Sequence, residues 1–208
     1  LTWMVYPLYS WPIIDPVSAQ GLLEILNQLS IGFLMGLSLQ IIIGALLLGG
    51  MSISNSMGLS IASMIDPNLG NVPVIAQLLV IISTLLFVGL GGHAILIRLV
   101  MESFTSLPIG RTLFEIGSWA QLVGWSSMMF IGALLVAMPI MVTLLLINIG
   151  LGVATRAAPS LNIFSVGFPA MIFGGFVILF LAMPNIATRI QWLWTQGFNQ
   201  VRLVIGTP

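Results

Sequence analysis

The stretch that decides the fold reads NIGLGVATRAAPSLNIFSVGFP and covers residues 148–169. It places Arg156 and Pro159 between two long apolar segments. In the hydrocarbon core of a membrane every backbone N–H and C=O group needs a hydrogen-bond partner. A broken, charged element is therefore tolerated there only where it packs on protein or lines a wet cavity. The break predicts that this chain packs against partner proteins or lines a pore.

The composition is that of a membrane protein. Of the 208 residues, 59% are hydrophobic and 5% are charged, whereas soluble domains contain roughly 25% charged residues. The formal net charge is zero and the arginines form no run, so the basic surface of a nucleic-acid-binding protein is not expected. The chain has no cysteine, which excludes disulfides, thiolate metal sites and cysteine catalysis.

Apolar periodicity predicts an all-α membrane protein built from four long hydrophobic helices in hairpins, at residues 22–51, 73–101, 126–154 and 166–183. Only the fourth is an uninterrupted apolar run near the length that spans a bilayer. The other three contain polar side chains, so we expect them to be buried largely in protein rather than lipid. These side chains are Gln40, Gln77, His93, Arg98 and Asn148. Within the first helix, Gly32 and Gly36 stand at GxxxG spacing, which permits close helix contact but also occurs by chance.

The segments between the helices carry turn and interface signals. Pro67 disfavours helical geometry at Asp66 and predicts a turn there. The tail from Asn185 onward contains Trp192 and Trp194, and we expect it to lie at the membrane interface. In a four-span arrangement most arginines fall on the side of the tail, which places the tail in the cytoplasm by the positive-inside tendency.

No pattern in the sequence indicates catalysis. The acidic residues are scattered singly, and there is no phosphate-binding loop or GxSxG motif. The sole histidine, His93, is better explained as a neutral, hydrogen-bonded side chain than as a ligand or proton relay. Arg98 and Glu102 stand four positions apart and predict an ion pair within one helix. We therefore expect no enzyme activity, no cofactor and no metal site.

The segment 52–71 is rich in glycine, serine and methionine and has two possible readings. Met57 and Met64 are flexible apolar side chains, and the serines and glycines leave the backbone adaptable. The segment could be a deformable seal that opens around a passing chain, or a packed hairpin that never moves. Composition alone favours the packed hairpin.

Three motifs, in order along the chain, resemble those of the FliR family, the flagellar members of the FliR/SctT export-gate subunits. The family pattern R-x-A-P-x-L-x-I/V-F-x-x-G-F-P is similar to residues 156–169. The family loop that ends in D-P resembles residues 57–67, and its G-H…F…LP-[IV]-G stretch resembles residues 92–110. The structural motif residues on this basis are Asp66, Pro67, Arg156, Pro159, Asn162, Phe164, Gly167, Phe168 and Pro169.

The resemblance implies a function that the residues alone do not show. Family members join FliP-like and FliQ-like subunits in a helical hetero-oligomeric export gate, partly lifted above the bacterial inner membrane at the flagellar basal body. We expect these partners here, together with FlhB-like and FlhA-like components, unfolded protein substrates and membrane lipid. Residues 1–208 would form a single FliR-like domain that lacks the N-terminal part of the family domain.

The resemblance also reverses the preferred reading of residues 52–71. In the family the matching loop projects into the pore and helps to plug it. The expected plug residues are Met51, Asn55, Met57, Gly58, Leu59, Ser60, Ile61 and Met64. The alternative is a small secondary transporter whose broken helix at 156–162 binds an anionic solute. Such a transporter should show an inverted repeat, and the second half has no counterpart to Asp66-Pro67.

Overall fold

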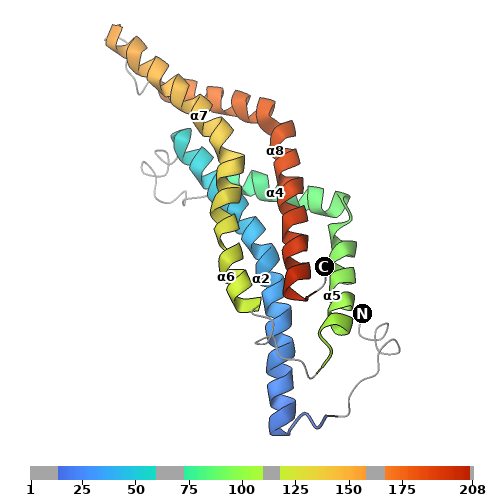
Figure 1. Ribbon diagram of the computed structural model, residues 1–208. Helices are drawn as coiled ribbons and strands as arrows, with labels where there is room; N and C mark the ends of the chain where they lie inside the picture. Colours follow the sequence, from blue (N-terminus) through green and yellow to red (C-terminus); the bar gives the residue numbers. More distant parts are fainter. Residues whose placement is uncertain (1–13, 60–72, 110–117, 158–166, 207–208) are drawn as a thin grey trace. The chain divides into compact units, whose positions relative to one another are not determined.

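The computed structural model describes residues 14–59, 73–109, 118–157 and 167–206. The regular elements of these ranges are helices (Figure 1), which confirms the predicted all-α class. Three helical stretches, Ala19–Ser56, Trp119–Ala157 and Phe168–Val204, are long and apolar enough to cross a membrane. Two shorter helices pass the same test only as a bent pair. The described chain is therefore an all-α membrane protein with three such spans, or four if the bent pair is counted.

Helix α2 (Ala19–Ser56) continues five residues past the predicted end of the first segment. Residues 52–56, expected as the start of a loop, are helical. The Ser52 hydroxyl donates to the carbonyl of Leu48 at 2.9 Å, and the Ser56 hydroxyl donates to that of Ser52 at 2.9 Å. Serine interrupts helices mainly when its hydroxyl competes for backbone groups elsewhere. Here the hydroxyls bond within α2, so the serine-rich sequence does not end it.

The second predicted helix is divided into α4 (Val74–Gly89) and α5 (Gly92–Ser106). Gly91 between them has a φ of 73°. This left-handed conformation is readily adopted only by glycine and cannot continue a right-handed helix. The prediction of one continuous helix was therefore wrong at Gly91. On α5, Nε of Arg98 lies 2.7 Å from Oε1 of Glu102, which confirms the predicted ion pair.

Helix α7 (Ser127–Ala157) matches the third predicted segment, and α6 (Ser118–Trp125) precedes that segment. Helix α8 (Phe168–Val204) extends the fourth segment by 21 residues. Pro184 stays inside α8, although proline removes a helical hydrogen bond. Buried residues recur at helical spacing beyond it and keep the helix packed: Ile186, Ile190, Leu193, Val201 and Val204. The predicted interfacial tail is thus the second half of a packed helix.

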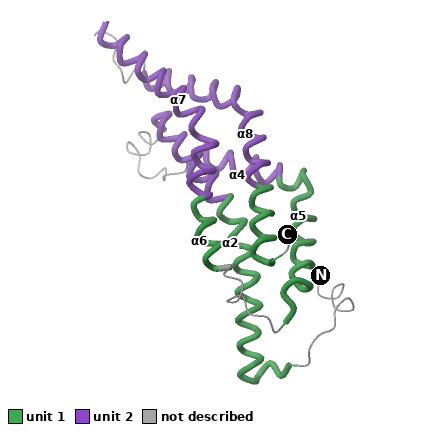
Figure 2. Tube along the Cα trace, viewed as in Figure 1, with its two compact units in different colours: residues 1–42, 87–127, 194–208 green, residues 43–86, 128–193 purple. Residues whose placement is uncertain are grey.

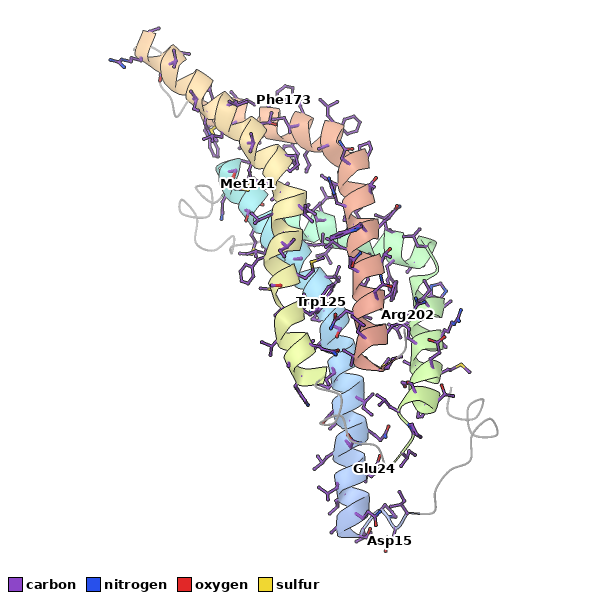
Figure 3. All side chains as sticks on the ribbon, in the orientation of Figure 1. Asp15, Glu24, Trp125, Met141, Phe173 and Arg202 are labelled. Atoms are coloured by element: carbon purple, nitrogen blue, oxygen red, sulfur yellow. The ribbon has the colours of Figure 1, made fainter. Side chains whose placement is uncertain are left out.

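The described chain forms two compact units (Figure 2). Unit 1 draws on residues 1–42, 87–127 and 194–208. Its buried core contains Ile31, Leu34, Met35, Leu99, Leu107, Leu122, Val201, Val204 and Ile205. Nε1 of Trp125, labelled in Figure 3, donates to the Ser38 carbonyl at 3.0 Å and joins α6 to α2. Trp194 is 7% exposed and packs inside this unit against Phe87, with the two ring centroids 4.6 Å apart. The interfacial place of the tail stays a prediction.

Unit 2 draws on residues 43–86 and 128–193 and depends on glycines at helix crossings. A Cβ atom on Gly50 of α2 would lie 2.3 Å from Cα of Ala76 on α4. A Cβ atom on Gly49 would lie 3.1 Å from the carbonyl oxygen of Ala133 on α7. The backbones approach closely because these side chains are absent. Unit 1 takes three stretches of the chain and unit 2 takes two, so neither is a separate sequence segment, and the single domain over 1–208 stays a prediction.

Candidate gate segment

The C-terminal end of α2 leads into the segment expected to form the plug. The backbone N–H of Met57 donates to the carbonyl oxygen of Ile53 at 2.9 Å, and the backbone N–H of Gly58 donates to the carbonyl oxygen of Asn55 at 3.0 Å. Gly58 has a φ of 76°. A glycine in the left-handed region just after the last helical turn is a frequent way to end a helix. Gly58 therefore stops α2 and directs the chain into Leu59.

Met57 is anchored on α8 within unit 2. Its side chain is 0% exposed. A Cβ atom built on Gly175 would lie 2.7 Å from both Cγ and Cε of Met57, so the thioether occupies the space that any other residue at position 175 would fill. The neighbouring Gly174 differs, because its Cβ atom would lie 3.4 Å from Cδ1 of Ile147, an ordinary contact distance. Gly175 is a notch that receives Met57.

Two helical turns before Met57, close backbone contacts at Gly49 and Gly50 fix the position of α2. The backbone contacts of Gly50 with Ala76 and of Gly49 with Ala133 hold α2 between α4 and α7. Because protein interiors transmit displacement through close packing, the position of Met57 depends on these crossings.

The predicted plug residues occupy two faces of the helix end. Met51, 45% exposed, and Asn55 are four residues apart and share the outer face. Met57 and Gly58 are buried, and Leu59 is half-buried. Met57 therefore faces the chain's own α8 in this conformation, where the sequence predicted a residue projecting into a pore. The predicted residues Ser60, Ile61, Met64, Asp66 and Pro67 lie outside the described residues.

The motif at 156–169 is described only at its ends. Arg156 is exposed in the last turn of α7, where a cation interacts favourably with the helix dipole. Gly167 is buried, Phe168 is half-buried and Pro169 is exposed at the start of α8. Proline is tolerated in a first helical turn because the N–H groups there have no helical acceptor. The predicted motif residues Pro159, Asn162 and Phe164 lie outside the described residues.

The chemistry of this site is apolar. The contact is between the apolar Met57 side chain and the Gly175 backbone, so the site can exclude water and pack. Within the described ranges, no group of three or more histidine, aspartate or glutamate side chains could hold a metal ion. His93, expected to be hydrogen-bonded, is an exposed residue in the first turn of α5.

Sequence reasoning missed Gly175, which receives the most deeply buried of the plug residues. The available signal was the pair Gly174-Gly175 inside an uninterrupted apolar run, since small residues mark close helix contacts in membrane proteins. That signal does not say which helix approaches. Met57 stands 118 positions earlier in the chain, and only the fold joins the two.

A protein-family model described as bacterial export proteins, family 1, matches residues 1–197. The chain belongs to this family. The match covers both the α2 end with Met57 and the α8 notch at Gly175. The recognition of the FliR/SctT export family from the three motifs is thereby confirmed.

Curated relatives support the same family. The flagellar biosynthetic protein FliR of Pectobacterium carotovorum is 36% identical over 194 residues, which is 93% of this chain and 73% of the relative. FliR of Escherichia coli is 34% identical over 181 residues, or 86% of this chain and 69% of the relative. The more distant surface presentation of antigens protein SpaR of Shigella flexneri is 27% identical over 139 residues, or 66% of this chain and 53% of SpaR.

Proposed function

We propose that this bacterial export family member is a component of flagellar type III protein export, and that the segment beginning at Met57 closes the channel. Family membership and the FliR relatives support the export role. The observation that supports the gate is the seating of Met57 in the Gly175 notch. The segment that follows Gly58 starts from this anchored point.

In the closed state we propose that Met57 holds the segment rather than facing the pore itself. The helix end is fixed at Gly49 and Gly50, and Met57 fixes the start of the following chain on α8. A narrow channel lined by apolar groups excludes water and ions by dewetting. Withdrawal of Met57 from Gly175 would free the segment and open the path for an unfolded polypeptide.

One feature of this helix end lowers the stability of the packed state. Ser54 is buried, and its hydroxyl has no hydrogen-bond partner within the described residues. A buried polar group without a partner costs about 1–3 kcal/mol. Because the closed packing includes this cost, a rearrangement that exposes or pairs Ser54 would regain part of it on opening.

We propose that the chain works in a hetero-oligomer with FliP-like and FliQ-like subunits, and with FlhB-like and FlhA-like components, in the bacterial inner membrane at the flagellar basal body. Two observations support partner contacts. The N-terminal half of α2 leaves Leu22, Leu23, Ile25, Leu26, Leu29 and Phe33 exposed, and contiguous exposed apolar surface marks contact with protein or membrane. The polar Gln40 and Gln77 are exposed within apolar stretches of α2 and α4, which in lipid is costly unless a partner satisfies them.

We propose further that the chain performs no catalysis and that the energy for export comes from other components. The contact between Met57 and Gly175 is apolar and offers no acid, base or nucleophile. A gate requires an element that can adopt two packing arrangements. We propose the end of α2, with Met57 in or out of the Gly175 notch, as that element.

The test compares two adjacent glycines. Gly175→Ala places a methyl group where Met57 packs and should displace it, whereas Gly174→Ala introduces only an ordinary contact with Ile147. At equal assembly, cells with Gly175→Ala should take up a small membrane-impermeant solute that wild-type cells exclude, and cells with Gly174→Ala should not. Deletion of Gly58–Ser60 should leak more strongly. Normal exclusion in both the Gly175→Ala and the deletion complexes would refute the gate.

A further inference from the structure

A cavity of about 510 Å³ lies between α7 and α8 within unit 2. Its apolar wall includes Leu135 and Ile140 of α7, and its polar wall includes Asn185, Thr188 and Arg189 of α8. The cavity is separate from the Met57 notch in its lining residues. Its size lies in the range of cavities that hold small organic ligands.

Both helices carry a proline at this cavity. Pro139 of α7 lines it, and Pro184 of α8 directly precedes Asn185. Proline has no N–H and pushes away the carbonyl four residues earlier, so Leu135 loses its helical donor at the cavity wall. The hydroxyl of Thr188 already donates to the Pro184 carbonyl at 3.1 Å. The amide of Asn185 and the guanidinium of Arg189 are left to meet a ligand.

Arg189 is an exposed cation, and no ion pair or hydrogen bond joins it to another residue in the part of the chain that the structure describes. A guanidinium presents several N–H donors in a planar fork that fits the oxygens of a phosphate or carboxylate. The amide of Asn185, one helical turn earlier, can add a further donor. The cavity is thus complementary in charge and hydrogen bonding to an anion.

Arg189 of α8 follows the apolar run 167–183 by six residues. A long basic side chain just beyond the end of an apolar span reaches the membrane interface. Trp192, 39% exposed, lies three residues further on, as expected of an aromatic residue at the interface. Leu181, 70% exposed, lies toward the apolar side.

We propose that this cavity binds one anionic phospholipid. Arg189 and Asn185 hold its phosphate group, and an acyl chain lies along Leu181, which shares a helix face with them because the three residues are spaced by four. A carboxylate from a partner protein would also satisfy the guanidinium. The order along α8 of an exposed apolar residue, two polar residues and a tryptophan fits a lipid spanning from acyl chain to headgroup, so we favour the lipid.

The experiment uses the complex purified with its co-purifying subunits in mild detergent. Native mass spectrometry after partial removal of lipid counts bound molecules while phosphatidylglycerol or phosphatidylcholine is added back. We expect one phosphatidylglycerol per chain, retained in preference to phosphatidylcholine. Arg189→Gln should weaken its retention about fivefold, because one arginine near a membrane surface contributes on the order of 1 kcal/mol to anionic lipid binding. Arg98→Gln, which removes an exposed arginine already paired with Glu102, is the matched control and should have no effect.

Two results would overturn the proposal. The first is equal retention of the two lipids by the wild-type complex, a readout that needs no variant and so stands even if Arg189→Gln prevents assembly. The second is unchanged phosphatidylglycerol retention in Arg189→Gln. Displacement of the phospholipid by millimolar inorganic phosphate would assign the site to free phosphate. If the Arg189→Gln complex fails to assemble and the wild-type complex carries no lipid, the site would be assigned to a carboxylate of a partner protein.

Discussion

The two halves of α2 are similarly apolar and glycine-containing, but their surroundings differ. In the N-terminal half, which belongs to unit 1, a Cβ atom on Gly32 or Gly36 would meet nothing within 4 Å. In the C-terminal half, which belongs to unit 2, Gly49 and Gly50 contact Ala133 and Ala76. Gly32 and Gly36, which have GxxxG spacing, contact no other helix. The adjacent pair Gly49-Gly50 instead lies at a packed helix crossing.

This comparison shows what determines a glycine contact. Close approach needs a small residue on both helices, and Ala76 and Ala133 supply it for the C-terminal half. The N-terminal half packs through side chains instead, because Ile31, Leu34 and Met35 enter the buried core of unit 1, while its glycines at 32 and 36 stay open. Both halves of α2 thus stabilise the subunit, but only the N-terminal half also leaves a row of exposed leucines that partners or lipid can contact.

The largest expected effect comes from alanine at Gly50. The added methyl group would overlap the backbone of Ala76, and overpacking of this kind costs about 1–3 kcal/mol or more. The melting temperature of the purified complex in detergent should fall clearly. Gly36→Ala is the matched control, and because alanine favours helix over glycine by about 1 kcal/mol, it should leave the melting temperature unchanged or raised. Equal losses from both substitutions would contradict the contrast between the halves.

An effect of comparable size is expected from shortening a buried leucine. Leu46 is fully buried in the C-terminal half, and Leu29 is exposed in the N-terminal half. Leu46→Ala should leave a cavity and cost about 2–5 kcal/mol of unfolding free energy, read as a lower melting temperature. Leu29→Ala should spare the subunit and reduce only the recovery of partner subunits. A normal melting temperature for Leu46→Ala would mean that this half is not the packed one.

The smallest expected effect concerns the point where α6 holds α2 in unit 1. Trp125→Phe keeps the aromatic ring and removes the N–H that donates to the Ser38 carbonyl. Loss of one such hydrogen bond costs about 1 kcal/mol, so the melting temperature should fall slightly. Trp119→Phe, a change at another tryptophan of α6 that is exposed, is the control. If both variants melt alike, the Trp125 bond does not stabilise this half.

The sequence predicted the features that depend on near neighbours. The apolar runs located the helical segments, and the spacing of Arg98 and Glu102 predicted their ion pair. Gly91-Gly92 was visible, but a left-handed glycine is one of several conformations open to it, so the break in the second helix did not follow. The fourth helix was predicted to end at residue 183, yet packing of Ile190 and Leu193 keeps α8 intact beyond it.

The candidate gate was only half predictable. The motif that contains Met57 and Gly58 identified the segment, and Gly58 is a recognisable helix stop. Burial of Met57 against Gly175 depends on two residues far apart in sequence, and no local pattern pairs them. The family resemblance supplied the proposed function of the segment, while the fold supplied the contact through which that proposal can be tested.

The most direct test of the gate uses the absence of cysteine from the chain. Cysteines at positions 57 and 175 would have Cβ atoms no more than about 4.2 Å apart, because Met57 Cγ lies 2.7 Å from a Cβ at Gly175 and one C–C bond of about 1.5 Å separates Cγ from Cβ. This upper limit lies within the range of disulfides. We predict that oxidation of the Met57→Cys, Gly175→Cys complex blocks flagellar protein export and that a reductant restores it, with each single variant unaffected by oxidation. Full export through a complex whose chains are shown to be crosslinked would contradict the claim that Met57 must leave Gly175 for the channel to open.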